Sequence, residues 1–323
     1  MSAIIIAKGL ATFVLPPSLA NRSDGEARSA PYCYSVFLRH LSRLHAAGCS
    51  TYPQVVGEIG PGASIGVGLA ALVAGASRYY GFDVKSYNAE PADIALFDDL
   101  VALFEARAGI PAGGRYAAVR PELKDHTFPH YILTARRLKQ ALAPARIADL
   151  RARLVAISTS GHSQRDDAPA QLVAPWFGAA RSHGIAPASV DWIFSQAVME
   201  HVDGIEGTYS ACADWLKPGG VMSHQIDLKS HGTARAWNGH WAYSDFAWRL
   251  VRGRRGHLIN RLPASAHRRA IEEAGFRIVE ALPVVRDDGL GRQSLAPRFR
   301  DLEDADLRTA GAFILACKRP LGA

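Results

Sequence analysis

The stretch that most constrains the fold is Val55–Gly66, which reads VVGEIGPGASIG. Its apolar start indicates the end of a β-strand, its glycines indicate a turn, and the apolar run Val67–Val73 indicates a helix. Gly60 and Gly62 lack the Cβ atoms that would keep a backbone away from a ligand. A helix that begins beyond them offers free N–H groups and a partial positive charge. The stretch therefore predicts the corner of a doubly wound α/β sheet that cradles a nucleotide.

A carboxylate follows at a distance that suits a ribose. Asp83 ends the run RYYGFD, which indicates a second strand, and a carboxylate there can accept hydrogen bonds from both ribose hydroxyls. An NAD site has the spacing G-x-G-x-x-G with an acid about 20 residues further on, whereas this chain has G-x-G-x-x-x-G. Asp83 is compatible with NAD or with S-adenosylmethionine, and a tight turn without a ligand is the third alternative.

Composition limits the class of protein. The 323 residues are enough for one large α/β domain with insertions or for two domains, and 48% apolar with 21% charged residues is typical of a soluble globular chain. The four cysteines, Cys33, Cys49, Cys212 and Cys317, show no zinc-binding spacing, so we expect reduced thiols and a cytoplasmic protein.

The net charge and the N-terminal residues indicate which binding partners the chain favours. A net charge of +7 favours acidic partners such as phosphate-bearing substrates, anionic lipid or nucleic acid. Met1–Leu15 is apolar but is interrupted by Lys8 and is too short to span a bilayer. We expect it to form a docking helix or strand, without stable insertion into a membrane.

We predict an N-terminal cap over residues 1–52 and a main domain over residues 53–323. The main domain contains a helical insertion at 85–168, which acts either as a lid or as a passive packing layer. It also contains an irregular stretch at 229–262 on the substrate side.

The remaining predicted strands are Gln171–Ala174, Val190–Ser195, Val221–Leu228, Phe276–Val285 and Ala312–Cys317. The predicted helices outside the insertion are Tyr34–Leu44, Val198–Leu216 and Ala266–Ala274, and Lys217–Gly220 is predicted as a tight turn.

Five stretches in this order resemble a class I S-adenosylmethionine-dependent methyltransferase. They are EIGPG (58–62), FD (82–83), VDWIFSQAVMEHV (190–202), LKPGG (216–220) and EAGF (273–276). The resemblance implies an α/β, Rossmann-like seven-stranded sheet with a reversed last strand, which Ala312–Cys317 would supply. Further stretches, including PYCYSV (31–36) and WNGHWAYS (237–244), are similar to a bacterial group of poorly defined substrate that is associated with surface-glycan assembly.

The resemblance implies S-adenosyl-L-methionine as the cofactor and gives roles to the residues of the glycine turn. Gly60 and Gly62, with Pro61 between them, would line its methionine part. Glu58 would lie beneath its ammonium group, directly or through a water. Asp83 would hold the ribose diol.

The resemblance also implies a place for adenine beyond the third strand. Many of these enzymes have an Asp and a small residue there, whereas this chain has Pro175 and Trp176. Either adenine stacks on Trp176, or Trp176 is an aromatic residue of the core. Ser195 and Gln196 would face the cofactor from the end of the fourth strand.

Methyl transfer to a hydroxyl needs an aligned acceptor and a base that takes its proton. His201, Asp227 and His240 are the candidate bases, because each lies near or beyond a strand end that faces the cofactor. His201 is alternatively a helix-face residue and Asp227 a cap. His224 lies within a strand and is predicted to be a core histidine.

The acceptor wall is predicted from the residues that follow the fourth and fifth strands. Trp237, Asn238 and Trp241 combine aromatic faces with polar groups that suit a sugar ring, although a packed cap has the same composition. Glu200, beside His201, is a further candidate substrate-binding residue. The two could alternatively bind a divalent cation, but two adjacent ligands without a recognisable third disfavour a metal site. Nearby arginines are candidates to meet a phosphate: Arg249, Arg252, Arg254, Arg255 and Arg261.

The predicted function is methylation of a hydroxyl on a small molecule or glycan. An NAD-dependent oxidoreductase is the first alternative, but it would not need LKPGG, and the chain lacks a Tyr-x-x-x-Lys pair. A non-catalytic methyltransferase-like binding module is the second alternative. Nucleic-acid methylation is disfavoured, because no Asn/Asp-Pro-Pro-Tyr loop is present and basic residues are not interleaved with aromatics. The sequence leaves the acceptor and the oligomeric state open.

Overall fold

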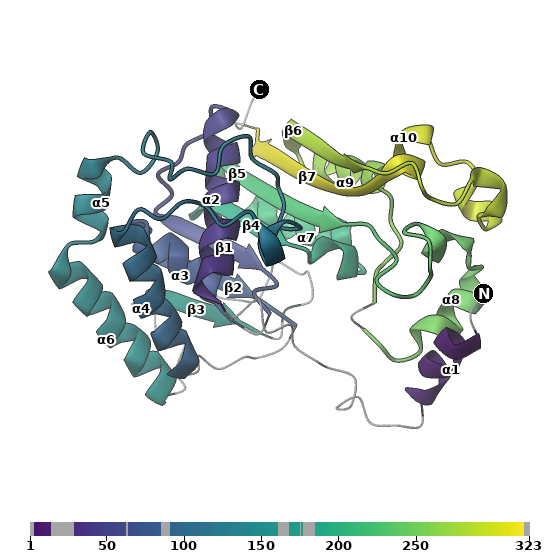
Figure 1. Ribbon diagram of the computed structural model, residues 1–323, viewed down its shortest axis with the longest axis horizontal. Helices are drawn as coiled ribbons and strands as arrows, with labels where there is room; N and C mark the ends of the chain where they lie inside the picture. Colours follow the sequence, from purple (N-terminus) through teal and green to yellow (C-terminus); the bar gives the residue numbers. More distant parts are fainter. Residues whose placement is uncertain are drawn as a thin grey trace.

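A computed structural model describes residues 3–13, 29–62, 64–84, 91–160, 168–174, 176, 185–256 and 258–319. These residues form a seven-stranded sheet in the order β3-β2-β1-β4-β5-β7-β6, in which only β7 runs antiparallel to its neighbours (Figure 1). The strands are β1 Val55–Ile59, β2 Arg78–Phe82, β3 Ala170–Val173, β4 Val190–Gln196, β5 Leu216–Asp227, β6 Phe276–Val285 and β7 Thr309–Lys318. This order confirms the predicted doubly wound fold with a reversed last strand.

Helices cover both faces of the sheet. One layer contains α2 Ala30–Ala46, α3 Gly66–Val73, α4 Pro91–Glu105, α5 Ala135–Ala141 and α6 Pro144–Ser160, and the other contains α7 Ile205–Trp215 and α9 Ala264–Glu273. Phe37 and Phe97 pack with Trp192 in the first layer, whereas Trp215 and Ile271 pack with the opposite face of the sheet. The predicted helix at Tyr34–Leu44 is thus part of the main core.

Apart from η3 Gly114–Tyr116 in the insertion and η4 Met199–His201 after β4, the remaining short helices lie beside the reversed strand, to the right in Figure 1. They are α1 Ala3–Ala11, η5 Gly239–Ala242, α8 Asp245–Arg252, η6 Arg292–Ser294, η7 Pro297–Phe299 and α10 Asp304–Arg308. Helix α1 packs closely on α8, because a Cβ atom at Gly9 would come 1.9 Å from the carbonyl oxygen of Leu250. The N-terminal segment is therefore a docking helix. Within the described residues, no helix has the length and apolar character needed to cross a membrane.

Three local predictions differ from the structure. The predicted helix over 198–216 is divided into the 3₁₀ turn η4, Met199–His201, and α7, which begins at Ile205. The predicted turn Lys217–Gly220 is a bulge within β5, because Val190 pairs with Leu216 and Trp192 pairs with Val221. The stretch 229–262 is less irregular than predicted, since Ser244 caps α8 by accepting a hydrogen bond from the Ala247 amide.

The loop between α4 and α5 is fixed to α2 by buried polar contacts. The Arg39 guanidinium donates to the carbonyl oxygens of Pro111 and Pro121 at 3.1 and 2.9 Å and to the hydroxyl of Ser35. The Tyr34 hydroxyl donates to the carbonyl of Ala108 at 2.7 Å. These contacts favour the packing-layer interpretation for this part of the insertion, whereas residues 85–90 and 161–167 lie outside the described residues.

His40 of α2 connects the helix layer with the carboxyl ends of β4 and β5. Its Nδ1 lies 2.8 Å from Ser223 Oγ and its Nε2 lies 3.1 Å from Gln196 Oε1, while Trp192 Nε1 donates to Ser223 Oγ. A neutral imidazole satisfies the network, with Nδ1 accepting from Ser223 and Nε2 donating to Gln196. Burial lowers the pKa of His40 from 6.5 to about 4.

We expect His40 to make unfolding pH-dependent. Because its folded-state pKa lies below its unfolded value, its stabilising contribution is complete above pH 6.5 and is lost as the pH falls toward about 4. The slope is at most about 1.4 kcal/mol per pH unit for one proton. Urea unfolding at pH 6.5, 5.5 and 4.5 should show a shallower pH dependence in His40→Asn than in the natural chain. Equal slopes in the two proteins would contradict this role. The other buried histidines and glutamates are the same in both proteins, so their contributions to the pH dependence cancel in the comparison.

Candidate active site

The glycine turn after β1 has the backbone that its sequence predicts. Gly60 and Gly62 have φ angles of +69° and +67°, in the left-handed region that favours glycine. A Cβ atom at Gly60 would lie 2.5 Å from Val198 Cγ1, whereas a Cβ at Gly62 would have no described atom within 4 Å. Pro61 packs against β2, since a Cβ at Gly81 would lie 3.2 Å from its Cγ. The turn thus packs tightly against Val198, which follows β4, at Gly60, and it leaves open space at Gly62.

Two acidic side chains lie at this turn. Asp83, which follows β2, accepts a hydrogen bond from the Gly62 amide at 3.0 Å through Oδ2. Glu58 of β1 is buried and accepts a hydrogen bond from the Tyr79 hydroxyl at 2.7 Å. Burial raises the pKa of Glu58 to about 8, so a cation next to it would favour its ionised form. The structure therefore places the turn and both predicted acids in one group.

The other predicted cofactor residues make contacts within the core. Trp176 is 4% exposed and packs against Phe82 and Trp215, with ring centroids 5.3 and 5.7 Å away, which favours the core-aromatic alternative. The Ser195 hydroxyl lies 2.8 Å from His224 Nδ1. Gln196 joins His40 to the carbonyl of Arg120. Pro175, which the sequence pairs with Trp176, lies outside the described residues.

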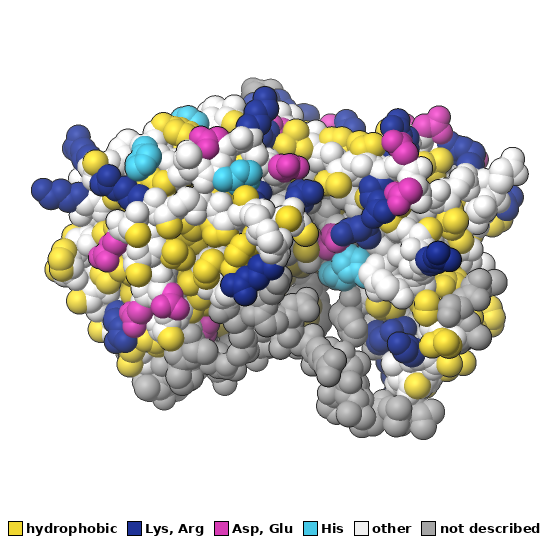
Figure 2. Space-filling view, viewed as in Figure 1, with side chains coloured by type: hydrophobic (Ala, Val, Ile, Leu, Met, Phe, Trp, Pro, Cys, Tyr) yellow, Lys and Arg dark blue, Asp and Glu magenta, His cyan; other side chains and the backbone are white. Residues whose placement is uncertain are grey.

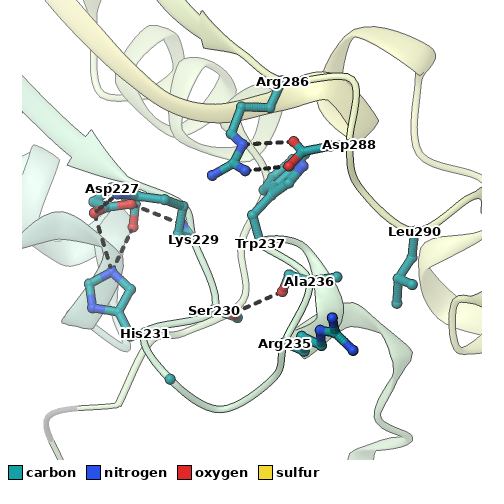
Figure 3. Close-up of a pocket in the computed structure, with 11 residues that line it drawn as sticks. Asp227, Lys229, Ser230, His231, Arg235, Ala236, Trp237, Arg286, Asp288 and Leu290 are labelled. Carbon is teal, nitrogen blue, oxygen red and sulfur yellow. Dashed lines mark hydrogen bonds and ion pairs between the residues drawn. The ribbon is translucent and has the colours of Figure 1, made fainter.

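A cavity of about 690 Å³ opens beyond the carboxyl end of β5. Figure 3 shows Asp227, Lys229 and His231 on one side of it, and Arg286 with Asp288 across from them. Its other described lining residues are Ser230, Gly232, Arg235, Ala236, Trp237 and Leu290. On the molecular surface, basic, acidic and histidine side chains gather around a hollow near the middle of the face seen in Figure 2. The cavity thus has polar and charged walls.

The lining carries more cations than carboxylates. Lys229 Nζ lies 3.1 Å from Asp227 Oδ2, and Arg286 forms a two-pronged ion pair with Asp288. Arg235 makes no hydrogen bond or ion pair with the described part of the chain and is exposed at the cavity. Pairing two of the three cations leaves the Arg235 guanidinium available to an anion.

The structure separates the residues that the sequence proposed for the acceptor site. Asp227 and Trp237 line the cavity. His240 is 1% exposed, and burial lowers its pKa to about 3, which argues against it as a base. Asn238 holds the loop after β6 through both the N–H and the C=O of Leu290, and Trp241 Nε1 donates to the Arg261 carbonyl. These three residues are core or positioning residues.

The predicted arginine cluster also has structural partners. Arg252 pairs with Asp203, Arg261 is buried and pairs with Asp245, and Arg255 donates to the carbonyl of Val251. Arg249 and Arg254 do not line the cavity either. The cations at the cavity instead come from positions that sequence reasoning missed, namely Lys229, Arg235 and Arg286. Lys229 and His231 could have been predicted from the sequence, because they closely follow β5 and ligands bind at the carboxyl ends of strands in an open α/β sheet.

A fourth missed residue, His231, meets two side chains that follow β4, Glu200 and His201. One ligand atom from each of Glu200, His201 and His231 lies within 4.8 Å of the others. The His201 and His231 rings are perpendicular, with centroids 5.0 Å apart. Glu200 is 1% exposed, and burial raises its pKa to about 8. This group borders the cavity through His231.

The fold and the glycine turn define a class I methyltransferase, and the family comparison agrees. The model of the family described as "Methyltransferase domain" matches residues 58–281, which is well over half of the chain. The chain belongs to this methyltransferase family, and it is an S-adenosylmethionine-dependent methyltransferase. No curated protein matches the sequence.

Solved structures resemble the chain at low identity. A methyltransferase in complex with the Trm112 activator of Haloferax volcanii is 15% identical, with 91% of this chain and 95% of that chain covered and a TM-score of 0.40. A structure described as a sarcosine dimethylglycine methyltransferase from Galdieria sulphuraria is 14% identical, with 87% and 86% covered and a TM-score of 0.42. Phosphoethanolamine N-methyltransferase 2 of Haemonchus contortus, in complex with S-adenosyl-L-methionine, is 14% identical, with 90% and 56% covered and a TM-score of 0.42. The assignment rests on the family match and not on these neighbours.

We expect Asp83→Asn to weaken cofactor binding. The amide oxygen can still accept from the Gly62 N–H, but the charge that would strengthen bonds to the ribose hydroxyls is lost. Hydrogen bonds to charged groups contribute about 1.5–3 kcal/mol each, so the affinity for S-adenosylhomocysteine should fall by roughly tenfold or more in calorimetry. Asp98→Asn, which removes an exposed carboxylate of α4, is the matched control. An unchanged dissociation constant in Asp83→Asn would place the ribose elsewhere.

Proposed function

We propose that this methyltransferase methylates a hydroxyl group of a small molecule or glycan that carries a phosphate or another anionic group. The observation that carries the proposal is the cavity beyond β5, which combines Asp227, Trp237 and Arg235. A volume of about 690 Å³ is in the range of sites for small molecules. The expected acceptor is not a nucleic acid.

The wall residues suit a polar, ring-shaped acceptor. Trp237 is buried at the cavity, and its Nε1–H has no hydrogen-bond partner in the described part of the chain. The aromatic side chain of Trp237 at the cavity supports a sugar or a similar amphipathic ring as the acceptor.

The reaction requires the acceptor oxygen to approach the cofactor's methyl carbon in line with the carbon–sulfur bond. The new carbon–oxygen bond forms as the carbon–sulfur bond breaks, and S-adenosylhomocysteine leaves with the bonding electrons. The hydroxyl proton must pass to a base. We assign this role to the Asp227 carboxylate, because it lines the cavity at the end of β5 and Lys229 holds it there.

We expect Asp227→Asn to lower turnover by about 10²–10⁴ while cofactor affinity remains nearly unchanged. The amide keeps the shape of the side chain but cannot take a proton at neutral pH. Single-turnover methyl transfer on an identified acceptor, together with calorimetry of S-adenosylhomocysteine, separates the two effects. Full activity in Asp227→Asn would exclude Asp227 as the base.

We expect Arg235→Gln to raise the KM for an anionic acceptor by about tenfold, because a charge-assisted hydrogen bond contributes about 1.5–3 kcal/mol. The turnover number should change little if the anion lies away from the reacting oxygen. Arg249→Gln removes an exposed arginine of α8 that does not line the cavity, and it should leave the KM unchanged. Equal KM values in Arg235→Gln and the natural chain would contradict an anion contact.

The proposed acceptor class is tested by methyl transfer from isotope-labelled S-adenosylmethionine to a panel. The panel contains nucleotide-linked sugars, sugar phosphates, neutral sugars, primary and secondary amines, and transfer RNA. We expect labelled methyl ethers on a phosphate-bearing sugar or polyol. Transfer confined to amines or to transfer RNA would overturn the proposed class.

A further inference from the structure

We propose that Glu200, His201 and His231 bind a divalent transition-metal ion beside the acceptor cavity. The three side chains come from two segments, since Glu200 and His201 belong to the turn η4 after β4 and His231 lies in the loop after β5. Strands β4 and β5 are parallel neighbours, so both segments leave the same edge of the sheet. The third ligand that the sequence did not reveal is therefore supplied by the adjacent strand.

The Glu200 carboxylate is the main evidence for a ligand at this place. It is 1% exposed, and within the described chain neither of its oxygens accepts a hydrogen bond. Its Oε1 lies 3.9 Å from His201 Nε2, and the group's ligand atoms lie within 4.8 Å of one another. A buried carboxylate that accepts no hydrogen bond is costly, and a cation would compensate it.

Hydrogen bonds from Asn260 hold the turn η4, which carries Glu200 and His201. The Asn260 side chain donates to the carbonyls of Met199 and Val202 at 2.9 and 2.8 Å, and the Asn260 amide donates to the Glu200 carbonyl at 2.6 Å. These three bonds fix the backbone on both sides of the Glu200 and His201 side chains. A metal site needs this kind of support for its ligands.

His231 is oriented by the end of β5. Its Nε2 lies 3.3 Å from the Asp227 carbonyl oxygen and 3.8 Å from Asp227 Oδ2, as Figure 3 shows. Histidines that bind metals commonly donate their second ring N–H to a carbonyl or carboxylate, which fixes the tautomer and leaves the other nitrogen for the metal. Its φ angle of +45° is unusual for a residue other than glycine, and here it accompanies this orientation.

The donor set indicates the kind of ion. Two imidazoles and one carboxylate suit Zn²⁺, Mn²⁺, Fe²⁺ or Co²⁺ better than Mg²⁺ or Ca²⁺, which prefer oxygen ligands. Zinc sites with two histidines and one glutamate leave a fourth position for water or substrate. Ligand atoms 3.9 Å apart at Glu200 and His201 need only a small contraction to reach bonds of about 2.0–2.2 Å to one ion.

The site would complement the proposed methyl transfer. An ion held here lies next to His231, which lines the cavity, so an acceptor oxygen in the cavity could occupy the open coordination position. Coordination would lower the pKa of a hydroxyl and ease transfer of its proton to Asp227. This role in catalysis rests on the proposed function, whereas binding of the ion does not.

The experiment measures the ion directly. The full chain is stripped with a chelator, loaded with Zn²⁺ or Co²⁺ and desalted, and bound metal is counted by mass spectrometry. We expect about one ion per chain, with visible absorption of the Co²⁺ form characteristic of four or five ligands. Glu200→Gln and His231→Gln should each lower metal affinity by at least tenfold, since even outer-shell partners contribute about 10–100-fold.

Two controls separate loss of the site from loss of the fold. His130→Gln removes an exposed histidine that is distant in sequence from all three proposed ligands, and this variant should keep the full metal content. Affinity for S-adenosylhomocysteine and the melting temperature should be retained in both ligand variants. The proposal would be overturned if the natural chain bound no metal. It would also be overturned if Glu200→Gln and His231→Gln bound as much metal as the natural chain. Because no acceptor is used, a negative result leaves the proposed function standing, and failure of the acceptor panel leaves the metal measurement valid.

Discussion

The parallel pairing of β1, β4 and β5 is the constraint on which the site depends. Because these strands run in one direction, the segments that follow them leave the sheet at the same edge. The glycine turn follows β1, Glu200 and His201 follow β4, and Asp227 ends β5. The order of the chain reverses between β1 and β4, which is where open α/β sheets bind ligands. The positions of the glycine turn and of the cavity beyond β5 are thus consequences of strand order.

Buried polar groups behave differently inside the sheet and at its edge. His40 is satisfied by Ser223 and Gln196, so a neutral imidazole can be buried without a large penalty. Glu200 is equally buried, but its carboxylate oxygens have no hydrogen-bond partner in the part of the chain that the structure describes. A carboxylate is costlier to bury without a hydrogen bond than a neutral polar group, which distinguishes Glu200 from the neutral side chains of the core and makes it a candidate ligand position.

The sequence predicted what local pattern determines and missed what neighbouring strands supply. The glycines at 60 and 62 and the carboxylate of Asp83 carry their own signal, and the structure joins them through the Gly62 amide. The helix predicted over 198–216 forms only from Ile205 onward, and the turn η4 before it is held by Asn260, about sixty residues away. His231 was missed for the same reason, since its nearness to His201 depends on the pairing of β4 with β5. His240 and Trp241 had the right composition for a binding wall, but composition does not distinguish a wall from a buried cap.

The segment 198–201 links the two halves of the site. On one side Val198 packs against the glycine turn so closely that a Cβ atom at Gly60 would come 2.5 Å from its Cγ1. On the other side, two and three residues further on, Glu200 and His201 face His231. Close-packed neighbours cannot move independently, so a shift of the glycine turn would also shift the carboxylate and imidazole at the cavity. The close approach of Gly60 to Val198 thereby sets the distance between the glycine turn and the side chains that border the cavity.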